Sequence, residues 1–112
     1  MGLAAAFSSN PPVVIKAGRT ITYRVTVTNI GAENWYWAGR SRVELRVDFA
    51  GSGTKPVALG MRRVIFPGQS YTFTIKVTAP SKPGAYVLRH RLIKVPSSWF
   101  ETAPQINVFV KR

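Results

Sequence analysis

The chain has 112 residues and a net charge of +12, because 16 Lys and Arg residues face only 4 Asp and Glu. It has no Cys, which excludes a disulfide framework and a thiolate metal site. Hydrophobic residues make up 46% of the chain, too many for a disordered tail, and the length fits one domain. No apolar run approaches the ~20 residues of a membrane-spanning helix, so we expect no membrane insertion.

The first residues are interpreted separately from the rest of the chain. The chain opens with a short apolar stretch, Met1 to Phe7, and we expect residues 1–10 to be a flexible N-terminal segment or a cloning remnant. A single domain is then predicted over 11–112. Residues 13–16 follow Pro11 and Pro12 and predict a short edge strand, since prolines suit an edge.

Apolar and polar residues alternate through most of the remaining chain, with Gly and Pro between the alternating segments. A period of two predicts half-buried strands, and no window of 11 residues shows the helical period. Weaker strands are predicted at 57–61 and 62–66. The stronger strands are predicted at 20–28, 42–49, 71–78, 85–94 and 106–110.

This pattern predicts an all-β fold. Seven or eight short strands at regular spacing are typical of an immunoglobulin-like β-sandwich of seven to eight antiparallel strands. A small closed barrel is the alternative.

Four short motifs give a more specific indication. They are Thr26-Val-Thr-Asn29-Ile-Gly31-Ala-Glu-Asn-Trp35, Pro67-Gly68-Gln69 before a Thr-rich strand, Ala79-Pro80-Ser-Lys-Pro83-Gly84-Ala-Tyr86, and Ser98-Trp99-Phe100. In this order they resemble the central Ig-like domain of the Next-to-BRCA-one family, also called the four-tryptophan (FW) domain, and above all its bacterial version. The resemblance covers about residues 13–111. Trp35 falls at the family's first tryptophan, whereas Trp37 has no counterpart.

The resemblance implies a binding or accessory role. Eukaryotic members bind other proteins through this domain, and the bacterial version is an accessory module of cell-surface or secreted proteins. An extracellular or cell-envelope location is therefore favoured if the parent protein is of that kind.

Catalytic chemistry finds little support in the sequence. The single histidine, His90, lies in the apolar alternation of its strand, which is typical of a core residue. Glu44 and Asp48 share a strand face about 13 Å apart, farther than the paired carboxylates of glycosidases. We therefore expect no enzyme, no catalytic residue, no metal site and no cofactor.

A basic contact face is predicted on two neighbouring strands. When the apolar residues of 42–49 and 85–94 face the core, four arginines point outward together, and Val87, Ile93 and Phe109 alternate onto the same side. Arginine and aromatic residues are enriched at interfaces, so this face is a candidate contact surface. The other interpretation is a solvated basic surface whose Arg stems cover apolar neighbours. The four arginines are Arg42, Arg46, Arg89 and Arg91.

Loop aromatics form a second candidate site. Tyr36, Trp37 and Trp99 lie in or beside predicted loops, where exposed rings serve as stacking platforms for sugars or partners. In the alternative interpretation, which the resemblance favours, Trp35 and Trp99 close the two ends of the sandwich.

Three functions remain open from these observations. The favoured one is a non-catalytic Ig-like accessory module that mediates protein interaction or spacing, with another protein or a neighbouring domain as partner. The first alternative is a carbohydrate-binding module that binds polysaccharide with its loop aromatics. The second is weak, salt-sensitive binding of nucleic acid or another anionic polymer through the arginine face.

Overall fold

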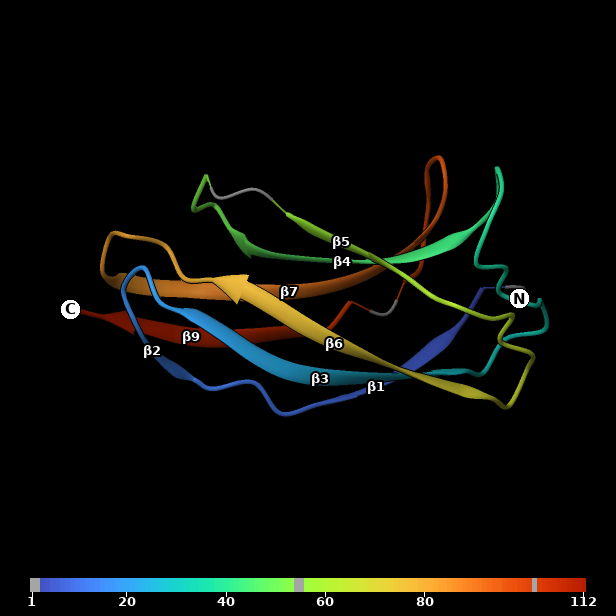
Figure 1. Cartoon of the computed structure of the whole chain (residues 1–112), viewed down its shortest axis with the longest axis horizontal. Helices are drawn as coiled ribbons and strands as arrows, with labels where there is room; N and C mark the ends of the chain where they lie inside the picture. The colour runs from blue at the N-terminus through green and yellow to red at the C-terminus, as the bar shows by residue number, and fades with distance from the viewer. Residues whose placement is uncertain (1–2, 54–55, 102) are drawn as a thin grey trace.

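The computed structural model describes residues 3–53, 56–101 and 103–112, and every regular element in these ranges is a strand. The strands, in chain order, are β1 (Ala5–Ser9), β2 (Val14–Lys16), β3 (Thr20–Asn29), β4 (Val43–Ala50), β5 (Val57–Gly60), β6 (Ser70–Thr78), β7 (Gly84–Lys94), β8 (Ser98–Trp99) and β9 (Gln105–Lys111). They form two sheets that pack as an Ig-like sandwich, ordered β1-β3-β6 and β2-β9-β7-β4-β5, with β8 beside β7 (Figure 1).

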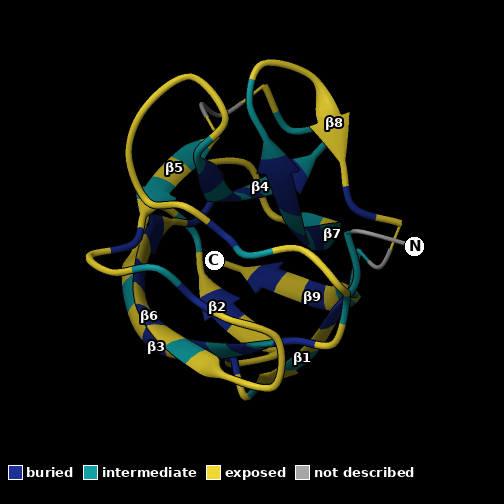
Figure 2. Ribbon diagram, turned by 90° about the vertical axis from the view of Figure 1, so that its right-hand side faces the viewer, coloured by how far each residue is buried: buried dark blue, intermediate teal, exposed yellow. Residues whose placement is uncertain are grey.

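The predicted alternation holds in the long strands. In the β3–β6 pair, Val25 lies opposite Phe73, and both side chains are buried. In the β4–β7 pair, Leu45 lies opposite Leu92, and both are fully buried. Figure 2 shows the result: buried segments alternate with exposed ones along β6 and β9, and mostly with half-buried ones along β4 and β7. The core therefore fills the space between the two inner faces.

Trp35 is the largest fully buried side chain. Its ring packs edge-on against Phe100, with centroids 5.4 Å apart. Its backbone exchanges two hydrogen bonds with Ile65, at 2.9 and 3.0 Å. The prediction that Trp35 belongs to the core is confirmed.

The Asn29 side chain stabilises the turn between β3 and Trp35. Its buried amide nitrogen donates to the carbonyls of Glu33 (2.8 Å) and Ile65 (3.0 Å), while its Oδ1 accepts from the Gly31 amide (3.1 Å). An asparagine side chain that bonds the backbone two residues on stabilises a turn. The turn directs the chain so that Trp35 enters the core.

Tyr86 marks the corner between β6 and β7. Its hydroxyl donates a 2.6 Å hydrogen bond to the carbonyl of Lys82, four residues upstream. A tyrosine near the start of this strand that bonds back to the corner backbone is a recurrent feature of Ig-like sandwiches.

Three predictions of detail are wrong, and one short strand was missed. Ala5–Ser9 do not belong to a flexible segment: they pair with β3, and Ala5 is buried. Residues 1–2 of that predicted segment lie outside the described residues. β2 runs parallel to β9, so the strands are not all antiparallel. Residues 62–66 form no strand, since only the bridge from Ile65 to Trp35 is present there. The two-residue strand β8 was not predicted.

None of the described residues forms a helix long and apolar enough to cross a membrane.

Candidate functional site

The outer face of the six-stranded sheet gathers the predicted arginines. β4 and β7 are adjacent and antiparallel, with Arg46 opposite Arg91 and Asp48 opposite Arg89. Arg42 comes directly before β4 and lies next to Tyr36 in a parallel bridge. The name arginine face is used below for Arg42, Arg46, Arg89 and Arg91.

Two carboxylates neutralise half of the arginine face. Glu44 accepts from Arg42 Nε at 2.6 Å and from Arg46 Nη2 at 2.9 Å. Burial raises the pKa of Glu44, but the hydrogen bonds and charges of the two arginines outweigh it, so the pKa lies below its usual value. Asp48 accepts two hydrogen bonds from Arg89, one of them from Nε at 2.9 Å. Four guanidinium groups and two carboxylates therefore leave two positive charges in excess.

Arg91 is held by an aromatic ring instead of a carboxylate. Its guanidinium carbon lies 4.3 Å from the centroid of the Trp99 ring. Among the described residues it has no ion-pair partner. Because Arg46 lies directly opposite, two like charges meet across the strands, which is unfavourable unless other groups compensate. Glu44 on one side and the Trp99 ring on the other supply that compensation.

Trp99 does not close the sandwich, contrary to the interpretation that the family resemblance favoured. β8 pairs with β7 and places Trp99 beside Ile93. Trp99 is 44% exposed, whereas the next residue, Phe100, is 4% exposed and packs on Trp35. Ile93 also points to the outer face but is buried there. The hairpin thus gives one ring to the core and the other to the arginine face.

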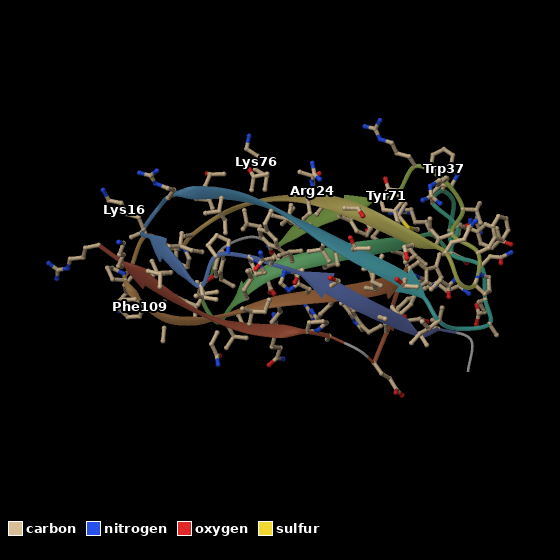
Figure 3. The ribbon with its side chains drawn as sticks, turned by 90° about the horizontal axis from the view of Figure 1, so that it is seen from below. Lys16, Arg24, Trp37, Tyr71, Lys76 and Phe109 are labelled. Carbon is tan, nitrogen blue, oxygen red and sulfur yellow. The ribbon has the colours of Figure 1, made fainter. Side chains whose placement is uncertain are left out.

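Tyr36 and Trp37 are exposed, at 49% and 48%, as the sequence predicts. They do not complete one platform with Trp99, because no ring contact joins these side chains among the described residues. Figure 3 places Trp37 at the end of the molecule where Tyr71 of β6 lies. The three predicted platform residues therefore share no common ring surface: the Trp99 ring lies against Arg91, whereas Tyr36 meets the arginine face only through its backbone bridge to Arg42.

An exposed apolar region lies at the other end of the same sheet, and no sequence motif marks it. Phe109 of β9 and Val14 of β2 lie opposite each other and are 54% and 53% exposed. Figure 3 shows Phe109 at the far end from Trp37. The alternation predicts that Phe109 points outward, but only the parallel pairing of β2 and β9 brings Val14 beside it.

His90 is buried in the core, as predicted, and bonds across the two sheets. Its Nε2 lies 2.6 Å from the Tyr23 hydroxyl. Burial lowers the pKa of His90, outweighing a backbone hydrogen bond with Pro104 that raises it. Burial likewise raises the pKa of Tyr23. The described residues contain no group of three or more His, Cys, Asp or Glu that could hold a metal ion.

The fold defines an immunoglobulin-like β-sandwich domain. No family model and no curated protein matches the sequence, so the resemblance to the FW domain stays a prediction. Solved structures share the fold. The solution NMR structure of a CARDB domain from Pyrococcus furiosus has a TM-score of 0.65 at 17% identity, over 98% of this chain and 97% of that one.

Two further structures are similar. The crystal structure of the Pyrococcus furiosus CARDB domain in complex with di-metal ions has a TM-score of 0.60 at 17% identity, over 97% of this chain and 87% of that one. A β-glucosidase from Listeria innocua in complex with glucose has a TM-score of 0.55 at 16% identity. That match covers 96% of this chain but only 16% of the glucosidase. At these identities the similarity concerns the fold alone.

Proposed function

We propose that the chain is a non-catalytic Ig-like accessory module that binds another protein, or a neighbouring domain of a larger surface or secreted protein. The observation that carries this proposal is the arginine face with the exposed Trp99 ring stacked under Arg91. Arginine and tryptophan are the residues that contribute most often to the binding energy of protein interfaces.

The fixed positions of the guanidinium groups on the arginine face favour a protein partner. Glu44 and Asp48 fix three of the four guanidinium groups in defined positions. An ordered array of donors recognises the carboxylates and carbonyls of a folded partner, because less side-chain entropy is lost on binding. The exposed Phe109 and Val14 extend the same sheet with apolar area.

The absence of catalysis is part of the proposal and rests on the titratable groups. His90 is enclosed in the core and bonded to Tyr23, away from any substrate. Glu44 and Asp48 are bound by arginines, and Glu33 lies 2.9 Å from Lys94 Nζ. The two arginines hold the pKa of Glu44 below its usual value, and a carboxyl group that stays ionised is a poor general acid.

An anionic polysaccharide is the second candidate ligand. The observation in its favour is Arg91, which has no carboxylate partner among the described residues and lies against an exposed indole ring. A ring that stacks a sugar and a guanidinium that binds its carboxylate or sulfate would suit an acidic sugar.

A capture experiment with matched variants tests the proposal. The immobilised domain is exposed to surface and secreted proteins of its source organism, and each captured protein is purified and titrated directly. We expect Arg46→Ser/Arg91→Ser to lose the partner. Arg19→Ser/Arg24→Ser is the control, because it removes the same charge outside the arginine face.

Equal binding by the two double variants would contradict the site. Retention of acidic polysaccharide alone, with no protein titrating, would favour the second candidate instead.

A further inference from the structure

The three-stranded sheet ends in a long unpaired strand, β6. The four strands at the edges of the two sheets are β1, β6, β2 and β5, of five, nine, three and four residues. Among the described residues β6 is hydrogen-bonded to β3 alone, whereas β5 of the opposite sheet approaches β6 without pairing with it. Unpaired edge strands are templates for pairing with another chain.

The hydrogen bonds of β6 show which groups face the open edge. At the two ends of the β3–β6 pair, Ala79 N donates to Arg19 O and Asn29 N donates to Gln69 O, each at 2.9 Å. Bonded pairs alternate in an antiparallel ladder, so the odd-numbered residues of β6 bond to β3. The even-numbered residues direct their amides and carbonyls outward. Those residues are Ser70, Thr72, Thr74, Lys76 and Thr78.

Part of this edge is already used by a side chain. Arg63 Nη2 donates to the Ser70 carbonyl at 2.9 Å, and its guanidinium lies over the Tyr71 ring. This contact shows that the Ser70 carbonyl points away from β3 and accepts a donor at the edge. The exposed part available to a new strand runs from Thr72 to Thr78.

A mainly apolar cavity lies beside the second half of β6. It has a volume of about 270 Å³. Its apolar lining is Val77 and Ala79 on one side and Val47, Phe49 and Val57 on the other, and Asp48, Lys76 and Thr78 add polar groups. It therefore opens between the edge of β6 and the opposite sheet. In a strand added to β6, the side chains opposite odd-numbered residues point inward, so one of them would enter this cavity.

The positive charge of the three-stranded sheet favours particular side chains on the outward-facing positions of such an added strand. β1, β3 and β6 contain no Asp or Glu. Arg24 and Lys76 are exposed on the outer face, where Figure 3 shows both. Residues of an added strand that lie opposite the even-numbered positions would share this face, and acidic side chains are favoured there.

We propose that the Thr72–Thr78 edge of β6 binds an extended peptide segment of a partner protein, with alternating acidic and apolar residues, as an added strand. Backbone hydrogen bonds to Thr72, Thr74 and Lys76 supply affinity. An apolar residue in the cavity and a carboxylate beside Lys76 supply specificity. This manner of peptide recognition uses a different sheet from the arginine face, so the two proposals stand or fall separately.

The probe is a fluorescein-labelled peptide of sequence TEVEVET, titrated by anisotropy and mapped by amide chemical shifts. We expect saturable binding, with shifts and slowed amide exchange concentrated at Thr72, Thr74 and Lys76. TEVPVET, in which proline removes a backbone donor, should bind at least about tenfold more weakly. The Arg46→Ser/Arg91→Ser protein should bind TEVEVET as well as the original does.

Two protein variants test the edge itself. Thr74→Pro removes an amide that does not bond to β3, and proline is tolerated at such edge positions, so the domain should fold and lose the peptide. Thr74→Ser keeps the amide and should bind normally. Lys76→Glu should reverse the preference from TEVEVET to TKVKVKT.

Absence of binding at millimolar peptide, shifts confined to β4 and β7, or an unchanged preference in Lys76→Glu would each overturn the proposal. Circular dichroism of the Thr74→Pro protein separates lost binding from lost folding.

Discussion

His90 and Arg91 are consecutive residues of β7, and their side chains lie on opposite faces of the same sheet. His90 is 1% exposed and meets the Tyr23 hydroxyl in the core. Arg91 lies on the outer face against the half-exposed Trp99 ring. Both side chains contact aromatic groups, but the histidine is neutral and enclosed, whereas the guanidinium is charged and only half-buried.

The difference follows from what each group can do when water is removed. Burial disfavours the charged imidazole, so the pKa of His90 falls and the neutral form fits the core. A guanidinium cannot lose its proton in a protein, so Arg91 is restricted to the outer face, where a ring supplies a negative π-face. In the core, a polar side chain must therefore be neutral and hydrogen-bonded. On the outer face, a charged side chain is stable when an opposite charge or an aromatic ring lies beside it.

The largest effect is expected inside the core, from Trp35→Ala. Trp35 is fully buried against Phe100, and truncation of such a ring costs about 3–5 kcal/mol. That is a large share of the 5–15 kcal/mol by which a domain is stable. Thermal or urea unfolding measures the loss. Trp37→Ala is the control, since its ring is half exposed, and equal losses in the two variants would contradict the assignment.

A pH-dependent loss of stability is expected from His90. The pKa is lowered in the folded protein, so the unfolded chain binds the proton more tightly. The contribution of the neutral His90 to the free energy of unfolding should be fully present above its usual pKa of 6.5 and should decline as the pH falls below that value. Glu44 adds its own loss only below 4.5, because its folded pKa is also lowered.

Melting temperatures between pH 8 and pH 5 therefore isolate the histidine. His90→Gln keeps a hydrogen-bonding group near Tyr23 but does not titrate, and its melting temperature should vary less over this range. If the melting temperature depended on pH equally in both proteins, the effect would come from a group other than His90.

A smaller effect is expected on the outer face, from Trp99→Ala. The variant removes the ring under Arg91, and a cation–π contact at an exposed site contributes about 0.5–1 kcal/mol. Chemical unfolding should show a loss of that size, far below that of Trp35→Ala. Trp99→Phe should recover part of it. A loss as large as that of Trp35 would place Trp99 in the core.

The smallest effect concerns binding of polyanions at low salt. Arg91→Ser should elute from heparin at lower salt than Arg42→Ser, although each change removes one charge. Arg42 is already bound by Glu44, whereas Arg91 has no carboxylate partner among the described residues. Identical elution of the two variants would mean that only total charge matters.

The period of two predicted most of the fold, and its failures have physical causes. Ala5–Ser9 was missed because small residues and serines give little strand signal, and the pairing with β3 supplies what propensity does not. The orientation of β2 was missed because alternation gives the faces of a strand and says nothing of its partner.

The candidate site was predicted only in part, because alternation gives the face of each side chain but not its neighbour on the next strand. Alternation placed Arg46, Arg89 and Arg91 on the outer face, but the pairing of Arg89 with Asp48 depends on the register between β4 and β7. Trp99 and Phe100 are adjacent aromatics, so their sequence alone does not tell which one is buried. The hairpin that pairs Trp99 with Ile93 decides it.

The parallel pairing of β2 and β9 has a mechanical consequence. The molecule is 44 Å long and about half as wide, and β1 begins at the end opposite to the one where β9 finishes (Figure 1). Tension applied at the two termini would load the β1–β3 pair first, because β1 precedes β2, and would then pull β2 and β9 along their lengths in opposite directions. The bonds between them, such as Phe109 N to Val13 O at 2.8 Å and Ala17 N to Lys111 O at 2.6 Å, would be loaded together in shear. A domain held in this way transmits force along its long axis and resists extension until several bonds break at once.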